Sequence, residues 1–174
     1  MAQEPEESTT AAPEPRWLSD EERKAWLATA SIMISLPAAL DSRLQRTAQL
    51  TLVEYMVLSV LSERADRTLR MNMIAAGVSS SLSRLSHVVT RLEKQGLLRR
   101  SRVPGSGRRT NATLTDAGYA KVVAAAPDHV AAVRDYFVDA LEPTDVAVIQ
   151  RLGRAVAERV NPAQPVIYGS WTDA

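Results

Sequence analysis

The fold is decided by residues 81–114, which read SLSRLSHVVTRLEKQGLLRRSRVPGSGRRTNATL. Ser81 is a typical helix N-cap, apolar residues follow it with helical spacing, and Gly96 can adopt the left-handed conformation that ends a helix. Residues 97–103 and 111–114 flank a turn-rich segment of Pro, Gly and Ser, which is typical of a β-hairpin. The pattern predicts one helix followed directly by a two-stranded hairpin.

Positive charge is concentrated in the same part of the chain. Between residues 84 and 109, eight basic residues stand against one acid, Glu93, which gives a local charge of +7, whereas all 174 residues together carry only +1. A segregated basic face of this kind is typical of nucleic-acid binding, because neutralised phosphates supply much of the binding energy. The basic residues are Arg84, Arg91, Lys94, Arg99, Arg100, Arg102, Arg108 and Arg109.

Three helices are expected before this stretch. Ser19 and the acids after it start a long first helix, in which apolar residues recur every fourth position, although Pro37 should kink or break it into two. Thr51 caps a second helix that ends near Arg64. A brief third helix is expected over Leu69–Ala76.

Two further helices are expected after the hairpin. Thr115-Asp116 opens a helix of some two dozen residues that Glu142-Pro143 stops, and Asp145 starts the last one. Three helices followed by a hairpin wing, with the charge in the last helix and the wing, is the order of a winged helix-turn-helix. The predicted fold class is therefore mainly α with a small β-hairpin wing.

The expected recognition helix has one apolar and one polar face. Arg can bond a guanine edge, and arginines at a protruding hairpin tip can reach the minor groove or the flanking phosphates. The alternative is an ordinary solvated helix face. Packing should use Leu82, Leu85, Val88, Val89 and Leu92, which leaves Lys94 facing outward with the other polar residues. The candidate DNA contacts are Ser81, Ser83, Arg84, His87, Thr90, Arg91, Arg100, Arg108 and Arg109.

These motifs resemble the multiple antibiotic resistance regulator (MarR) family over about residues 50–141. The resemblance rests on the order and spacing of Leu50-Thr51, Leu69-Arg70-Met71, Ser83-Arg84-Leu85-Ser86-His87, Arg91-Leu92-Glu93 before Gly96-Leu97, and Leu114-Thr115-Asp116-Ala117-Gly118. Family members place Asp-x-Arg in the wing, where this chain has Ser106-Gly107-Arg108. Without that Asp, Arg108 is expected to be held less rigidly.

The resemblance implies a homodimer built from the first helix and the last two, which binds a near-palindromic double-stranded operator. Apolar residues of the last two helices, such as Val130 and Leu152, independently suggest a partner chain, with an intramolecular helical hairpin as the alternative. We expect an acidic disordered tail over 1–15, a dimerisation helix over 17–47, the winged lobe over 48–115, dimerisation helices over 116–160 and a tail over 161–174.

The family often senses a small aromatic or anionic ligand, which implies a pocket between the dimer platform and the DNA-binding lobe. Met and aromatic residues at helical spacing are more often core, so the pocket assignment has a plain alternative. The candidate pocket residues are Trp26, Met33, Tyr55, Met56 and His87.

Other classes of function find little support in the sequence. The chain has no cysteine and two histidines, and we find no nucleophile elbow, metal-ligand spacing or phosphate loop, so we expect no enzyme, metal site or cofactor. An acidic leader without Lys or Arg argues against export, and the apolar stretch 25–40 is too short to span a bilayer. We expect a cytoplasmic protein. The alternatives are a winged helix that binds protein, or a ligand sensor with weak DNA binding.

Overall fold

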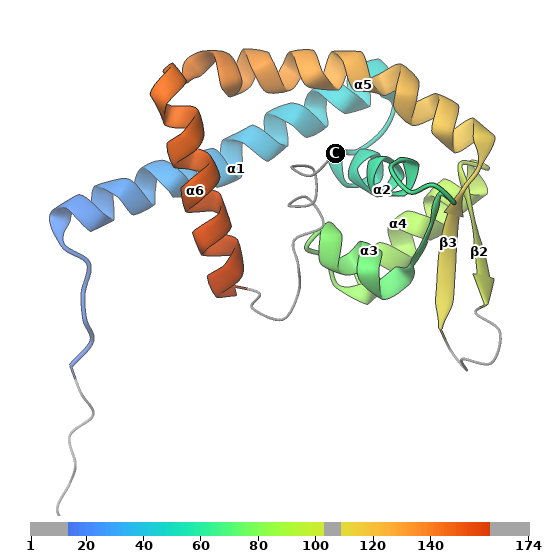
Figure 1. Ribbon diagram of the computed structural model, residues 1–174, viewed down its shortest axis with the longest axis horizontal. Helices are drawn as coiled ribbons and strands as arrows, with labels where there is room; N and C mark the ends of the chain where they lie inside the picture. Colours follow the sequence, from blue (N-terminus) through green and yellow to red (C-terminus); the bar gives the residue numbers. More distant parts are fainter. Residues whose placement is uncertain (1–13, 103–108, 161–174) are drawn as a thin grey trace, which may run out of the picture. The chain divides into compact units, whose positions relative to one another are not determined.

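The computed structural model describes residues 14–102 and 109–160 (Figure 1). The predictions for the two tails and for the Ser106-Gly107-Arg108 triplet lie outside these residues, apart from 14–15. The chain divides into two units, Met1–Ile34 and Ser35–Ala174. Its elements are α1 (Asp20–Ala48), α2 (Leu52–Ser62), β1 (Thr68–Arg70), α3 (Met71–Gly77), α4 (Leu82–Lys94), β2 (Leu98–Arg102), β3 (Thr110–Leu114), α5 (Asp116–Tyr136), the 3-10 turn η1 (Val138–Ala140) and α6 (Pro143–Val160).

The first helix, α1, runs unbroken through Pro37, so the alternative of two shorter helices was wrong. The predicted start is confirmed, because the Ser19 hydroxyl accepts from the Glu22 amide at 3.2 Å and the Glu22 carboxylate accepts from the Ser19 amide at 2.8 Å. These reciprocal bonds satisfy backbone donors that the first helical turn would otherwise leave unpaired.

The length of α1 bears on the expectation that the apolar stretch 25–40 is too short to span a bilayer. Among the described residues, this 29-residue helix alone is long and apolar enough to cross a bilayer, judged by length and composition only. The stretch 25–40 lies inside this helix, which continues on both sides of it. The mean hydropathy over its most apolar window is 1.2.

The predicted caps of α2 and α4 are confirmed. Thr51 and Glu54 form a capping box at the start of α2, and the Ser81 hydroxyl accepts from the Arg84 amide at 3.2 Å at the start of α4. Gly96 follows α4 with a φ of 71°, a conformation that costs glycine little.

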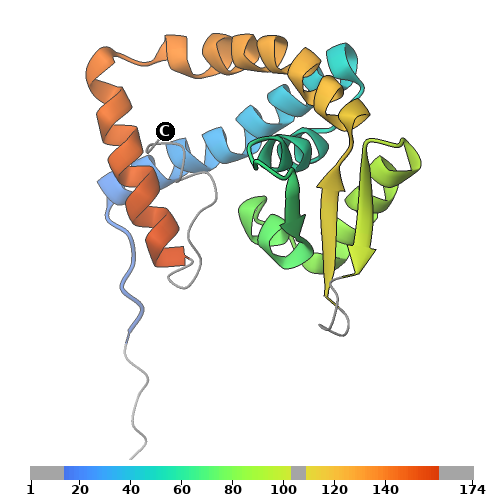
Figure 2. The same cartoon turned by 45° about the vertical axis from the view of Figure 1, so that its right-hand side comes forward.

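The sheet has one strand more than the sequence predicted. Leu69 and Arg70 were expected in the third helix, but they belong to β1, which pairs antiparallel with β3, and α3 begins only at Met71. The strand order is β1-β3-β2 (Figure 2). A three-residue strand is too short to show an alternating pattern, and its hydrogen bonds come from residues more than 40 positions away.

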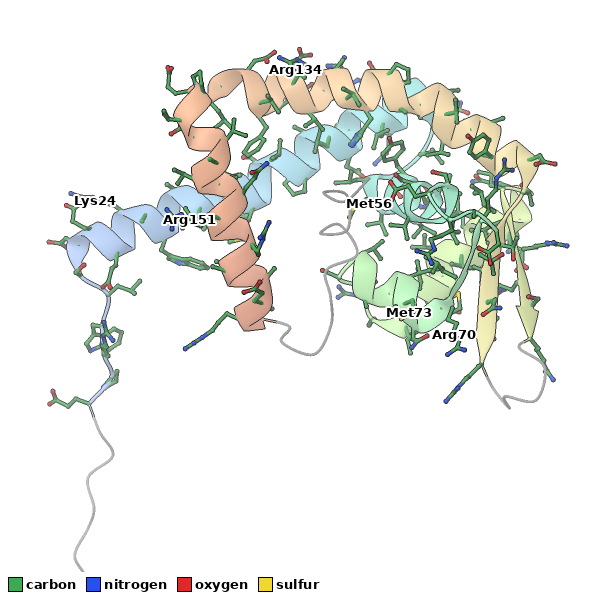
Figure 3. All side chains as sticks on the ribbon, in the orientation of Figure 1. Lys24, Met56, Arg70, Met73, Arg134 and Arg151 are labelled. Carbon is green, nitrogen blue, oxygen red and sulfur yellow. The ribbon has the colours of Figure 1, made fainter. Side chains whose placement is uncertain are left out.

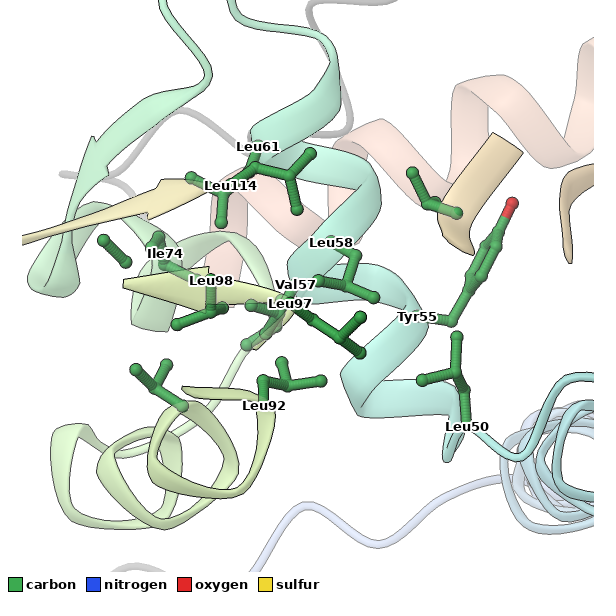
Figure 4. Packing of buried hydrophobic residues seen from close by; sticks show 14 of the residues in the cluster. Leu50, Tyr55, Val57, Leu58, Leu61, Ile74, Leu92, Leu97, Leu98 and Leu114 are labelled. Carbon is green, nitrogen blue, oxygen red and sulfur yellow. The ribbon is translucent and has the colours of Figure 1, made fainter. Parts of the chain in front are cut away.

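The core lies between α2, α3, α4 and the sheet (Figure 4), with contributions from the end of α1 and the first half of α5. The recognition helix contributes Leu85, Val89 and Leu92, as expected, and Val88 packs against this core while only partly buried. The prediction for Leu82 was wrong, because this first residue of α4 is 55% exposed. The large core side chains with essentially no exposed surface are Leu44, Leu50, Val57, Leu58, Val60, Leu61, Ile74, Leu85, Val89, Leu92 and Leu98.

The helix α5 ends earlier than predicted. It stops at Tyr136, and Phe137 leaves the helical conformation with a φ of −135° before the turn η1. The last helix, α6, starts at Pro143, a residue whose missing amide suits the first helical position. Asp145, the expected start, instead accepts the Glu142 amide at 3.0 Å and so caps this end.

A close backbone approach joins the wing to the start of α5. The Leu97 carbonyl accepts the Thr115 amide at 3.1 Å, and Gly118 lies against the same carbonyl. A Cβ on Gly118 would overlap the Leu97 oxygen and lie 2.7 Å from Leu114 Cδ1. Only glycine fits here without a backbone shift.

We therefore expect Gly118→Ala to lower the free energy of unfolding by about 2 kcal/mol or more, as overpacking against rigid backbone does. Urea unfolding followed by circular dichroism measures this change. The control is Gly153→Ala on α6, where an added Cβ meets nothing within 4 Å. Alanine favours a helix over glycine by about 1 kcal/mol, so the control should be neutral or stabilising. Equal stability of Gly118→Ala and wild type would contradict the close packing.

Candidate DNA-binding surface and ligand cavity

The outer face of α4 carries most of the predicted recognition residues. Ser81, Ser83, Arg84 and His87 are exposed, and Arg84 has no ion-pair partner among the described residues. Thr90 is half-buried, and its hydroxyl donates to the Ser86 carbonyl at 2.8 Å. The arrangement leaves Arg84, one turn into the helix, free to reach a base edge.

The predicted contact Arg91 has a partner inside the protein. Its Nε donates to Oε1 of Glu54, a carboxylate that is only 3% exposed, and its Nη2 lies 3.3 Å from the Thr51 hydroxyl. The Arg91 side chain is nevertheless 52% exposed. One edge of the guanidinium is thus fixed to α2 while the rest meets solvent.

Arg100 is likewise paired. Its Nε and Nη2 donate to Glu93 Oε2 at 3.0 and 2.7 Å, and its backbone amide donates to Glu93 Oε1 at 3.0 Å. The backbone and side-chain hydrogen bonds from Arg100 lower the pKa of Glu93. This ion pair joins β2 of the wing to the C-terminal end of α4.

Other arginines on the sheet are exposed and have no ion-pair partner within residues 14–102 and 109–160. Arg100 and Arg102 share the face of β2 that carries Leu98, whereas Arg99 points to the other face. Arg109 precedes β3 and is exposed, and Arg108 lies outside the described residues. Arg70, at the end of β1, is another exposed arginine of the sheet (Figure 3). The sequence did not suggest it as a candidate DNA contact, because β1 itself was not predicted.

A cavity of about 400 Å³ lies between α2 and α5. The rings of Tyr55 and His129 lie against each other in its lining, with centroids 4.3 Å apart and planes tilted by 42°. Arg134 lines the cavity but pairs with Asp139 at 2.6 Å. The lining is mainly apolar and consists of Tyr55, Met56, Ser59, His129, Val130, Val133, Arg134 and Val138.

Burial controls the ionisation of the two facing rings. It lowers the pKa of His129, against a smaller opposing effect of Asp128, so the imidazole is neutral at pH 7. Burial also raises the pKa of Tyr55. The Nδ1 atom of His129 is buried and has no hydrogen-bond partner among the described residues. The cavity therefore presents two uncharged aromatic walls.

The sequence identified only part of this cavity. Tyr55 and Met56 line it, but His87, Trp26 and Met33 do not. Trp26 and Met33 are exposed in the unit Met1–Ile34, and His87 lies on the outer face of α4. The sequence suggested only a dimer surface for Val130 of α5, because no local pattern shows that α5 packs on α2.

A cluster of charges holds α5, one wall of the cavity, against the C-terminal part of α1. Arg43 donates to Asp128 at 2.8 Å and to Asp135 at 2.7 Å, and the Thr47 hydroxyl donates to Asp128 at 2.8 Å. The hydrogen bond from Arg43, and to a smaller extent the one from Thr47, lowers the pKa of Asp128. The carboxylates of Asp128 and Asp135 in turn raise the pKa of Arg43. Arg43 also lies 6.0 Å from the centre of the Tyr136 ring.

A three-helix lobe with a basic recognition helix and a wing defines the winged helix-turn-helix class of protein. The family model for the MarR family matches residues 48–109. No curated protein sequence matched the chain.

The crystal structure of Sco3205, a MarR family transcriptional regulator from Streptomyces coelicolor in complex with DNA, is similar to this chain with 40% identity and a TM-score of 0.82, over 87% of this chain and 95% of that one. AbsC, a MarR family transcriptional regulator from the same organism, shows 35% identity and a TM-score of 0.79, over 85% and 99%. The chain belongs to the MarR family of transcriptional regulators.

A third structure shows the fold alone, because its identity is only 24%. It is CouR from Rhodococcus jostii RHA1 bound to p-coumaroyl-CoA, with a TM-score of 0.64 over 82% of this chain and 96% of that one.

The ion pairs of Arg43 with Asp128 and Asp135 predict that the free energy of unfolding depends on pH. Because the folded-state pKa of Asp128 lies below its ordinary value near 3.8, the contribution of this carboxylate is complete above that value and is lost as the pH falls through the folded-state pKa. Asp128→Asn should therefore lower the urea midpoint at pH 7, and the difference from wild type should shrink at acid pH. The control is Asp116→Asn, which removes a single pair from a fully exposed carboxylate and should change the midpoint less. A difference that is the same at both pH values would argue against the ion pairs.

Proposed function

We propose that this protein is a cytoplasmic, homodimeric regulator that binds a near-palindromic double-stranded DNA operator and represses transcription by occluding a promoter. The observation that carries the proposal is the exposed, unpaired Arg84 on the outer face of α4, beside a wing whose Arg102 and Arg109 are also exposed and unpaired among the described residues. A helix with this face fits the major groove, and wing arginines suit the flanking phosphates. The DNA-bound relative Sco3205 supports the proposal.

The proposed partner chain would cover apolar surface that this chain leaves open. None of the residues of α6 is buried, and its Val156 and Val160 are among the most exposed apolar side chains. This favours a second copy over an intramolecular helical hairpin as the cover. We also propose that the apolar face of α1 meets the second copy and not lipid.

The cavity between α2 and α5 is the proposed site of a small aromatic effector. Its apolar walls and the aromatic rings of Tyr55 and His129 suit a planar ring, and Arg134 could exchange Asp139 for an anionic group of the ligand. Such a ligand relieves repression only if it favours the DNA-free arrangement, because equal affinity for both states shifts nothing.

We predict that the purified protein sediments as a dimer at micromolar concentration. The chain mass is 19.0 kDa, so sedimentation equilibrium should give twice that value. Val156→Glu on α6 should shift the equilibrium towards monomer, because a charge would be buried in the interface. A wild-type protein that stays at 19.0 kDa would contradict the proposed assembly.

We predict that Arg84→Ala and Arg109→Ala weaken DNA binding in different ways. Loss of a base contact at Arg84 should cost about 1 to 3 kcal/mol on an operator selected from random duplexes and relax the base preference. Loss of a phosphate contact at Arg109 should weaken binding to all sequences alike and make the salt dependence shallower by about one unit. Fluorescence anisotropy with operator and random duplexes over a salt series separates the two. Equal losses on both duplexes for Arg84→Ala would rule out base reading.

A further inference from the structure

Glu54 is the single charged residue among the described residues that is buried. Its Oε2 accepts the Thr51 amide at 2.8 Å and the Thr51 hydroxyl at 3.0 Å, and its Oε1 accepts Nε of Arg91. The bonds to Thr51 are local to the start of α2, whereas the bond to Arg91 joins two helices through residues 37 positions apart. Glu54 therefore links the start of α2 to the last turn of α4.

Helix capping alone does not require this charge. The capping box is satisfied by glutamine as well as by glutamate, because only a side-chain oxygen is needed. A buried carboxylate is costly, and apolar residues of similar volume are often equally stable, so stability is a weak reason for the ion pair. The feature that a carboxylate offers and an amide does not is a strong, directed bond to the Arg91 guanidinium.

That bond decides how Arg91 faces solvent. With Nε bound to Glu54, the guanidinium plane is fixed, and half of the side chain remains exposed on the face of α4 that also carries Arg84. Asp41 fixes the other side of the same junction, because its Oδ1 accepts the Leu52 amide at 2.7 Å. The start of α2 is thus a rigid anchor for the recognition helix.

We propose that Glu54 is a positioning residue for DNA recognition, which aims Arg91 at the DNA backbone and fixes the rotation of α4 so that Arg84 meets base edges. The inference rests on the proposed function. Glu54 itself touches no DNA. Because its carboxylate cancels the charge of Arg91, Arg91 contributes more to the orientation of the protein on DNA than to the electrostatic attraction between them. Its loss should reduce sequence discrimination without weakening general attraction to DNA.

The test is Glu54→Gln, which keeps the volume and the capping oxygen and removes the charge. We expect the preference for operator over random duplex to fall by roughly tenfold, the size of one mismatched base pair. Affinity for random duplex should be unchanged or higher, and its salt dependence should steepen by about 0.9, because Arg91 is no longer neutralised. The control is Glu63→Gln at the other end of α2, where the side chain is exposed and wild-type behaviour is expected.

A purely structural role gives a different result. If Glu54→Gln lowers operator and random affinity in parallel with its Tm and leaves the salt dependence unchanged, the inference is overturned. Should this variant fail to fold, Arg91→Lys keeps the charge but lacks the Nε edge, so operator preference should fall while the salt dependence on random duplex stays the same. Retained operator preference in Arg91→Lys would likewise overturn it. A wild-type protein that binds no duplex would instead refute the proposed function.

Discussion

Burial of α2 is the constraint on which the recognition helix, the wing and the cavity all depend. Val57, Leu58 and Leu61 have essentially no exposed surface, so this helix cannot rotate or slide without opening the core. Its first turn binds Arg91 of α4 through Glu54, and its outer side lines the cavity. An apolar helix held on several sides in this way transmits a displacement at one of its faces to the others.

Charge in this lobe is divided between residues that hold the structure and residues that face outward. Glu54 and Glu93 each bind one arginine of the basic stretch, Arg91 and Arg100. The local charge of +7 counted along the sequence therefore overstates the positive charge that is available to DNA, since Glu54 lies outside that window. The paired arginines fix helix and wing geometry, and unpaired ones such as Arg84 are left for intermolecular contacts.

Local features of the sequence predicted local features of the structure. The caps at Thr51 and Ser81, the left-handed Gly96 and the hairpin were all confirmed, because each depends on residues within a few positions of one another. Features that depend on distant contacts were missed. The strand β1 exists through its pairing with β3, and the cavity wall at His129 exists through the packing of α5 on α2.

Leu82 is exposed and Glu54 is buried, which is the reverse of what their hydrophobicity predicts. Leu82 begins α4 and Glu54 binds Arg91 of α4, so both positions bear on the orientation of that helix. Tyr55, which contacts His129 in the cavity lining, is the residue next to Glu54, which binds Arg91. Because successive residues of a helix move together, a ligand that separated the two rings by displacing α2 would also displace the carboxylate that aims Arg91. If the cavity holds the proposed effector, the first turn of α2 is the physical link between it and the recognition helix, and the strength of that coupling is set by how much better the effector fits the displaced helix than the resting one.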